Sequence, residues 1–136
     1  MLVIRRFVVS GALLSFLLIA VGCGGAPEGP PRASVSGKIT LDGQPVEGGT
    51  IYFVPEKGPM ASATIAGGSY SISAGERGPV LGKSTVKVEW YRDSGKKDSG
   101  GAAISEQAIP VKYLGMTALS VEILAGLNTH DFTLTK

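Results

Sequence analysis

Residues 34–42 read SVSGKITLD and alternate between apolar or small side chains and polar ones. In an extended chain, Val35, Gly37, Ile39 and Leu41 lie on one face, because successive side chains of a strand point to opposite faces. Such alternation over a short stretch is typical of a half-buried β-strand. This stretch therefore predicts a sheet with one face against a core.

The rest of the chain after residue 34 repeats this pattern, with glycine turns between the strand-like stretches. Asp42-Gly43 and Gly67-Gly68 are strong signals of tight turns, and the second predicts a hairpin between its flanking strands. The further strand-like stretches are GTIYFVP (49–55), ASATIA (61–66), SYSIS (69–73), KSTVKVEWY (83–91), LSVEIL (119–124) and NTHDFTLT (128–135). About seven strands at short intervals predict an all-β, antiparallel seven-stranded sandwich over residues 34–136.

The N-terminal segment has a different composition. Arg5 and Arg6 precede an uncharged run over residues 7–22, and that run has 16 residues. A helix that spans a bilayer core needs roughly 20 residues. A basic start, a short apolar run and small residues at its end predict a signal peptide over residues 1–22, with an N-terminal signal helix.

Cys23 is the only cysteine of the chain, and it follows directly on this segment. Ala20-Val21-Gly22-Cys23 resembles the bacterial lipobox, in which a cysteine receives a diacylglyceryl group and, after cleavage, an N-acyl chain such as palmitate. Stable membrane anchoring takes more than one acyl chain, which such a modification supplies. The alternatives are a cleaved signal with an unmodified cysteine and an uncleaved membrane anchor.

A glycine- and proline-rich stretch, GGAPEGPPRA, occupies residues 24–33. Such a composition does not build a core, so residues 23–33 are expected to form a lipidated flexible tether. We expect the domain to be lipid-anchored in the cell envelope, on the periplasmic face of a membrane or on the cell surface.

The domain after the tether resembles a known family. The stretch GKITLDGQPVEGGTIYF (37–53) resembles the opening of carboxypeptidase regulatory-like domains, Gly68-Ser69-Tyr70 resembles their Gly-x-Tyr hairpin, and Gly82 with the valines that follow it resembles a later strand of theirs. The end of the chain, over residues 109–132, is similar to small planctomycete-type lipoproteins. The resemblance implies a transthyretin-like sandwich and a non-catalytic accessory module, with no catalytic residues to transfer.

Charge gives no reason to expect a nucleic-acid partner. The formal net charge is +2, and Arg5 and Arg6 account for it, so that 11 basic and 11 acidic residues remain after the signal peptide. Proteins that bind nucleic acid carry a basic surface for the phosphates.

The sequence also gives little reason to expect a catalytic or metal-binding site. His130 is the only histidine, and its neighbour Asp131 points to the opposite face of a strand, so we expect a partly buried packing histidine. Asp93 and Asp98 lack the spacing of a calcium loop, and neither a metal site nor a cofactor is expected. Gly82-Lys83-Ser84 resembles the end of a phosphate-binding loop, but a strand follows where that motif requires a helix.

The remaining candidates are aromatic. Trp90 shares the inward face with Val86 and Val88, whereas Tyr91 and Tyr113 are expected to be exposed beside a long polar loop, 92–108. The sequence therefore predicts a non-enzymatic module that contacts an envelope protein or polysaccharide through Tyr91 and Tyr113. A carrier of a small apolar ligand and, less favoured, an enzyme that uses the 92–108 loop are the alternatives.

Overall fold

The computed structural model describes residues 22, 24–25, 28–115 and 119–136. The signal helix and the lipidation site at Cys23 lie outside the described residues. In the part of the chain that is described, no helix has the length and apolar character needed to cross a membrane.

The first sheet is built around its longest strand, β1 (Ser34–Leu41), which is paired along both edges. The first half of β1 pairs antiparallel with β5 and parallel with β10; the second half pairs antiparallel with β2 and parallel with β11. The partners of β1 are β2 (Gln44–Pro45), β5 (Ser69–Ile72), β10 (Leu127–Thr129) and β11 (Phe132–Leu134).

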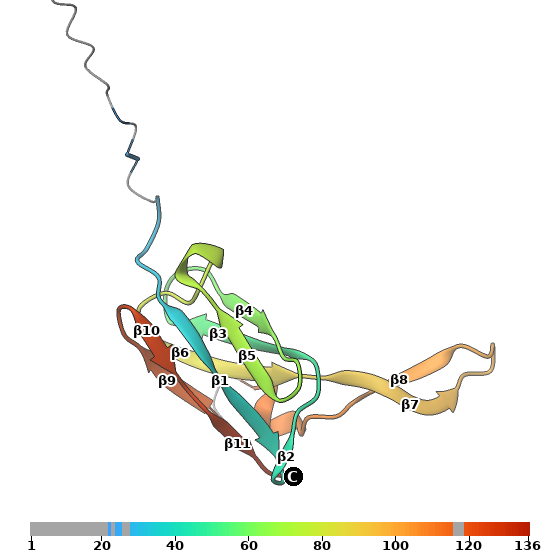
Figure 1. Ribbon diagram of the computed structural model, residues 1–136. Coiled ribbons are helices and arrows are strands. Elements are labelled where there is room, and N and C mark those ends of the chain that lie inside the picture. Colours follow the sequence, from blue (N-terminus) through green and yellow to red (C-terminus); the bar gives the residue numbers. More distant parts are fainter. Residues whose placement is uncertain (1–21, 23, 26–27, 116–118) are drawn as a thin grey trace, which may run out of the picture.

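The second sheet has four antiparallel strands in the order β4–β3–β6–β9, and it packs face to face with the first (Figure 1). A third, two-stranded sheet projects away from both. The bounds are β3 (Thr50–Pro55), β4 (Ala61–Thr64), β6 (Gly82–Glu89), β9 (Leu119–Ile123), β7 (Tyr91–Lys97) and β8 (Ala103–Gln107), with short 3-10 helices η1 (Ala74–Glu76) and η2 (Val111–Tyr113).

The core lies between the first two sheets, and the alternation of the sequence fills it. The first sheet contributes Val35 and Ile39 of β1, and the second contributes Phe53 of β3 with Val86 and Val88 of β6. All five side chains are buried. Each such side chain contributes about 1.5–3 kcal/mol when it is fully buried. The all-β prediction is therefore confirmed.

The expectation of a purely antiparallel sheet was wrong, because β10 and β11 run parallel to β1. After β9, the last strand on the edge of the second sheet, the chain turns and crosses to the first sheet. The described residues form eleven strands in three sheets instead of seven in two.

The structure forms tight turns at both predicted glycine positions, but the strands that flank them pair differently. At Asp42-Gly43 the backbone φ angles are 50° and 79°, and Leu41 pairs with Gln44, which confirms a tight turn between paired strands. At Gly67-Gly68 the turn is also present, with φ angles of 56° and 75°. The predicted hairpin is reduced to a single antiparallel bridge between Ala66 and Ser69, because β4 pairs with β3 and β5 pairs with β1.

Contact with a neighbouring turn explains why the chain changes sheet at Gly67-Gly68. Gly68 is pressed against Pro45, and a Cβ atom at this glycine would be 2.6 Å from the Pro45 Cβ. The Gly68 amide donates to the Val46 carbonyl, and the Ile39 amide donates to the Gly68 carbonyl. These bonds attach the turn to the first sheet.

Candidate functional site

The segment predicted as a loop over residues 92–108 is instead a β-hairpin, which we call the arm (β7 and β8, residues 91–107). It continues the direction of β6 beyond the edge of the body and projects into solvent (Figure 1). The register places Tyr91 opposite Gln107 and Asp93 opposite Ser105. Nearly every side chain of the arm is exposed.

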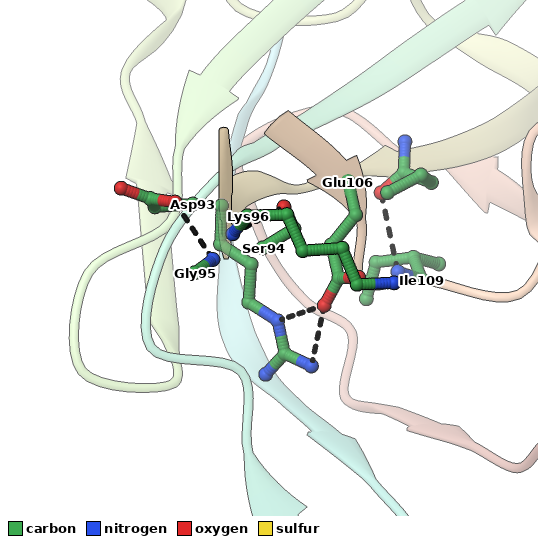
Figure 2. Close-up of polar contacts among 8 residues, drawn as sticks. Asp93, Ser94, Gly95, Lys96, Glu106 and Ile109 are labelled. Atoms are coloured by element: carbon green, nitrogen blue, oxygen red, sulfur yellow. Dashed lines mark hydrogen bonds and ion pairs between the residues drawn. The ribbon is translucent and has the colours of Figure 1, made fainter. Parts of the chain in front are cut away.

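An irregularity interrupts β7 in the middle of the arm, between Asp93 and Lys97. The Asp93 Oδ1 atom accepts a hydrogen bond from the Gly95 amide at 2.8 Å, and the Ser94 Oγ atom accepts one from the Lys96 amide at 3.2 Å (Figure 2). Gly95 has a φ of 74°, which side chains other than glycine rarely adopt. Local side chains therefore satisfy these amides of β7, and the bulge disturbs this edge of the arm as a pairing surface.

Asp98 holds the turn at the end of the arm. Its Oδ1 atom accepts hydrogen bonds from the Gly100 amide at 2.8 Å and the Ala102 amide at 2.9 Å. Both carboxylates of the arm considered as calcium ligands, Asp93 and Asp98, thus serve the backbone of their own turns. No group of three or more metal-binding side chains is found among the described residues.

The base of the arm is fixed to the body by Gln107. Its Oε1 atom accepts hydrogen bonds from the Trp90 amide at 2.8 Å and the Ile109 amide at 3.1 Å, the second of which Figure 2 also draws. Trp90 is half-buried against the core, so its predicted inward position is confirmed. The Arg92 guanidinium lies 5.7 Å from the centre of the Trp90 ring and 3.3 Å from Glu106.

The two faces of the arm differ in character. Tyr91 is 64% exposed, as predicted, and it shares its face with the paired Gln107. Ile104 is also exposed, and strand alternation places it with Glu106 on the other face. One face therefore presents an aromatic ring and the other an aliphatic side chain beside an ion pair.

The expectation that Tyr113 is exposed was wrong: only 8% of it is accessible. Its hydroxyl oxygen accepts a hydrogen bond from the Thr135 amide at 3.0 Å, and this bond, with smaller effects of Lys112, lowers the pKa of the phenol. Tyr113 lies in η2 and packs into the core cluster, so it does not share a surface with Tyr91. It is a structural residue that ties the end of the chain to the body.

His130 and Asp131 do not form a pair. The Asp131 Oδ1 atom accepts from the Lys38 amide at 2.8 Å, and the His130 carbonyl accepts from the Tyr70 hydroxyl at 2.6 Å. The His130 side chain is half-buried, as expected of a packing residue. Burial, followed by the Asp131 carboxylate, raises the pKa of Tyr70, so this hydroxyl stays protonated and donating.

The last residues assigned to the tether belong to the body instead. Arg32 forms a β-bridge with Val80, its guanidinium donates to the Gly78 carbonyl at 2.7 Å, and Ala33 is fully buried. A cavity of about 420 Å³ lies beside them, lined by Glu28, Gly29, Pro30, Pro31, Arg32, Ala74, Gly75 and Arg77. The folded domain thus begins at Arg32.

Comparison of the chain with protein-family models and with curated proteins finds no match.

Proposed function

We propose that this chain is an exported lipoprotein, anchored in the cell envelope through Cys23, whose transthyretin-like sandwich is a non-catalytic module that binds an envelope protein through the arm. The order of charge, apolar run and small residues before Cys23 supports the anchor. The single observation that supports the binding role is the arm itself, an ordered hairpin that buries almost none of its own side chains.

The side chains of the arm add almost nothing to the core of the body. A two-stranded hairpin alone is marginally stable, and three or more strands with an apolar face are needed for independent stability. Here the ion pair of Arg92 and Glu106, the bonds of Gln107 and the capped turn at Asp98 hold the strands in register. An ordered segment of this kind offers its surface to a partner.

A protein partner is favoured over a polysaccharide. Sugar rings stack on exposed aromatic faces, and the arm offers only Tyr91, because Arg92 lies over the ring of Trp90. By contrast, β8 (Ala103–Gln107) has an outer edge with which no described strand pairs. Such an edge presents N–H and C=O groups on which an extended segment of another protein can add a strand.

Site-specific photo-cross-linking in cells that produce the full chain tests the partner. A benzoylphenylalanine at Ile104 should give a discrete adduct with one envelope protein, and the same group at exposed Thr133, in β11 of the body, should not. Equal adducts at both positions, or co-sedimentation with purified peptidoglycan that is lost in Tyr91→Ala, would overturn the protein-binding role.

The anchor is tested separately with Cys23→Ala. We expect the wild-type chain in the membrane fraction and the variant outside it, and mass spectrometry of the wild-type N-terminal peptide should show the acyl chains. Retention of the variant in the membrane fraction would contradict anchoring at Cys23.

A further inference from the structure

The end of the body that receives the tether is formed by three segments. The Ser34 amide donates to the Gly126 carbonyl at 3.0 Å, so the start of β1 lies beside the turn from β9 to β10 (Figure 1). Arg32 is paired with Val80 directly before that point. The loop over residues 56–60 reaches the same end, because Pro55 pairs with Ser84 near the start of β6.

Two leucines at this end are turned away from the core. Leu124 is 64% exposed and Leu127 is 91% exposed, and both belong to the turn Leu124-Ala125-Gly126-Leu127. Met60, also exposed, lies at the same end but beside β4, on the other edge of the second sheet. We call Leu124 and Leu127 the apolar tip.

The apolar tip is held in a fixed conformation. The side chain of Asn128 is buried, its Oδ1 atom accepts from the Leu124 amide at 2.9 Å, and its Nδ2 atom donates to the carbonyls of Leu124 at 2.8 Å and Ser34 at 3.2 Å. One side chain thus closes the turn and fastens it to β1. The leucines are exposed by a rigid turn, so little conformational entropy is lost when they are buried against another phase.

Charge around the tip is balanced. The charged residues that line this end or adjoin it are Arg32, Lys57, Arg77 and Lys83 with Glu28, Glu56, Glu76 and Glu122. Equal numbers of both signs give no net attraction to an anionic surface. The property that distinguishes this end is the exposed aliphatic surface.

We propose that the apolar tip inserts into the lipid surface to which the chain is anchored, so that the arm points away from the membrane. This inference rests on the proposed anchor at Cys23. Arg32 lies nine residues after Cys23 in the sequence; a glycine-rich chain of nine such steps has a root-mean-square span of about 17 Å. The tether therefore keeps this end of the body, and no other, next to the lipid, where leucine side chains leave water for the acyl boundary.

Depth-dependent quenching with the full lipidated chain in vesicles tests the insertion. The acylated chain is purified from membranes and reconstituted in neutral phosphatidylcholine vesicles, with Cys23 blocked by its lipid. Leu127→Cys supplies one thiol for an environment-sensitive fluorophore. Val111→Cys is the matched control, because Val111 is also aliphatic and is 78% exposed. It lies in η2, near the C-terminal residues that pair with the end of β1, whereas the apolar tip lies at the start of β1.

We expect a blue-shifted emission and strong quenching by lipids brominated near the headgroup for the label at position 127, and neither for the label at position 111. Equal quenching in vesicles with and without anionic phosphatidylglycerol should follow from the balanced charge. A label at 127 that is quenched no more than the label at 111, or one quenched only with anionic lipid, would overturn the proposal. So would a blue shift that appears already in detergent and depends on protein concentration, since a second copy would then cover the tip.

The failure of the tip and the failure of the anchor have different signatures. If Cys23 carries its lipid by mass and the chain stays with the vesicles, an unquenched label at position 127 refutes insertion alone. If Cys23 is unmodified, the wild-type chain itself reacts with the fluorophore, and both the anchor and the inference that rests on it are wrong. A Leu124→Ser/Leu127→Ser variant should remain folded by circular dichroism and stay on vesicles, yet allow faster extraction by mild detergent.

Discussion

The body and the arm are ordered by different forces. In the body, each of the strands β1, β3 and β6 carries side chains that are fully buried between the sheets. In the arm, β7 and β8 carry none, and they are held together by their backbone pairing, one ion pair and the side-chain hydrogen bonds of the turn at Asp98. Burial of apolar surface therefore specifies the body, and polar contacts of much smaller energy specify the arm.

The arm should tolerate substitutions that the body does not. A substitution in the body is limited by close packing, because interiors are as dense as organic crystals. We expect a substitution of an exposed arm residue to leave the body folded and to alter only what the arm presents. The arm also lies far from the tether, because residues 82–97 run through β6 and β7 for about 50 Å at the rise of an extended strand.

The largest expected difference is between a core residue of the body and an exposed residue of the arm. Phe53→Ala should lower the free energy of unfolding by about 3–5 kcal/mol, because it leaves a cavity beside the Tyr70 ring, whose centre lies 5.9 Å away. Ile104→Ala should change it by less than about 0.5 kcal/mol. Urea unfolding of the two purified variants measures this, and similar losses for both would show that the arm is part of the core.

The next largest loss of stability is expected in β1, which is paired along both edges. A Cβ atom at Gly37 would overlap the His130 carbonyl, which is backbone and cannot move aside as a side chain can. Gly37→Ala should therefore cost about 2–3 kcal/mol. Gly75→Ala is the matched control, because nothing lies within 4 Å of a Cβ atom there; thermal unfolding should show a change of less than about 1 kcal/mol for it. A Gly37→Ala protein as stable as this control would mean that β1 is not confined on both edges.

The sequence predicted the body wherever apolar alternation follows the strands. Val86 and Val88 are buried on one face, as their spacing indicates, and the Asp42-Gly43 turn forms as expected. Strand pairing was less predictable, because alternation tells which face is buried and not which strand lies alongside. The parallel pairs of β1 and the change of sheet at Gly67-Gly68 depend on long-range packing for this reason.

The arm was missed because its first strand, YRDSGKK, has no apolar alternation to detect. Exposure of Tyr91 was predicted correctly, whereas Tyr113 is buried by a one-turn helix whose orientation is set by its contact with the body. The leucines of the apolar tip were also missed as surface residues. Leu124 falls on the outward face of the alternation that Val121 and Ile123 follow, but only the three-dimensional turn shows that Leu127 faces outward as well.

Alkaline pH offers a smaller and more specific probe of the body. Because burial raises the pKa of Tyr70, the folded state keeps this phenol neutral above pH ~10, where the unfolded chain begins to ionise it. Ionisation then favours the unfolded state, so stability that is fully present below pH ~10 should fall as the pH rises further. In Tyr70→Phe that fall should be shallower.

At neutral pH, Tyr70→Phe should lose about 1 kcal/mol, the usual net value of one hydrogen bond, here the bond to the His130 carbonyl. Urea unfolding at pH 8 and at pH 10.5, with wild type alongside, measures both effects. The same alkaline slope in both proteins would mean that the Tyr70 phenol is not shielded from water.

The smallest expected effect lies in the arm. Arg92 and Glu106 form an ion pair at 3.3 Å, and both side chains are about half exposed, so solvent screening leaves at most about 0.5 kcal/mol for the pair. A double-mutant cycle with Arg92→Ala and Glu106→Ala should give a coupling of that size at low salt and none in 1 M salt. Global unfolding should hardly change, while hydrogen exchange of the β7 and β8 amides should accelerate and that of β1 and β6 should not. Slower or unchanged exchange in the arm would mean that the arm draws its order from the body. The distinction between a body ordered by apolar burial and an arm ordered by polar contacts would then be wrong.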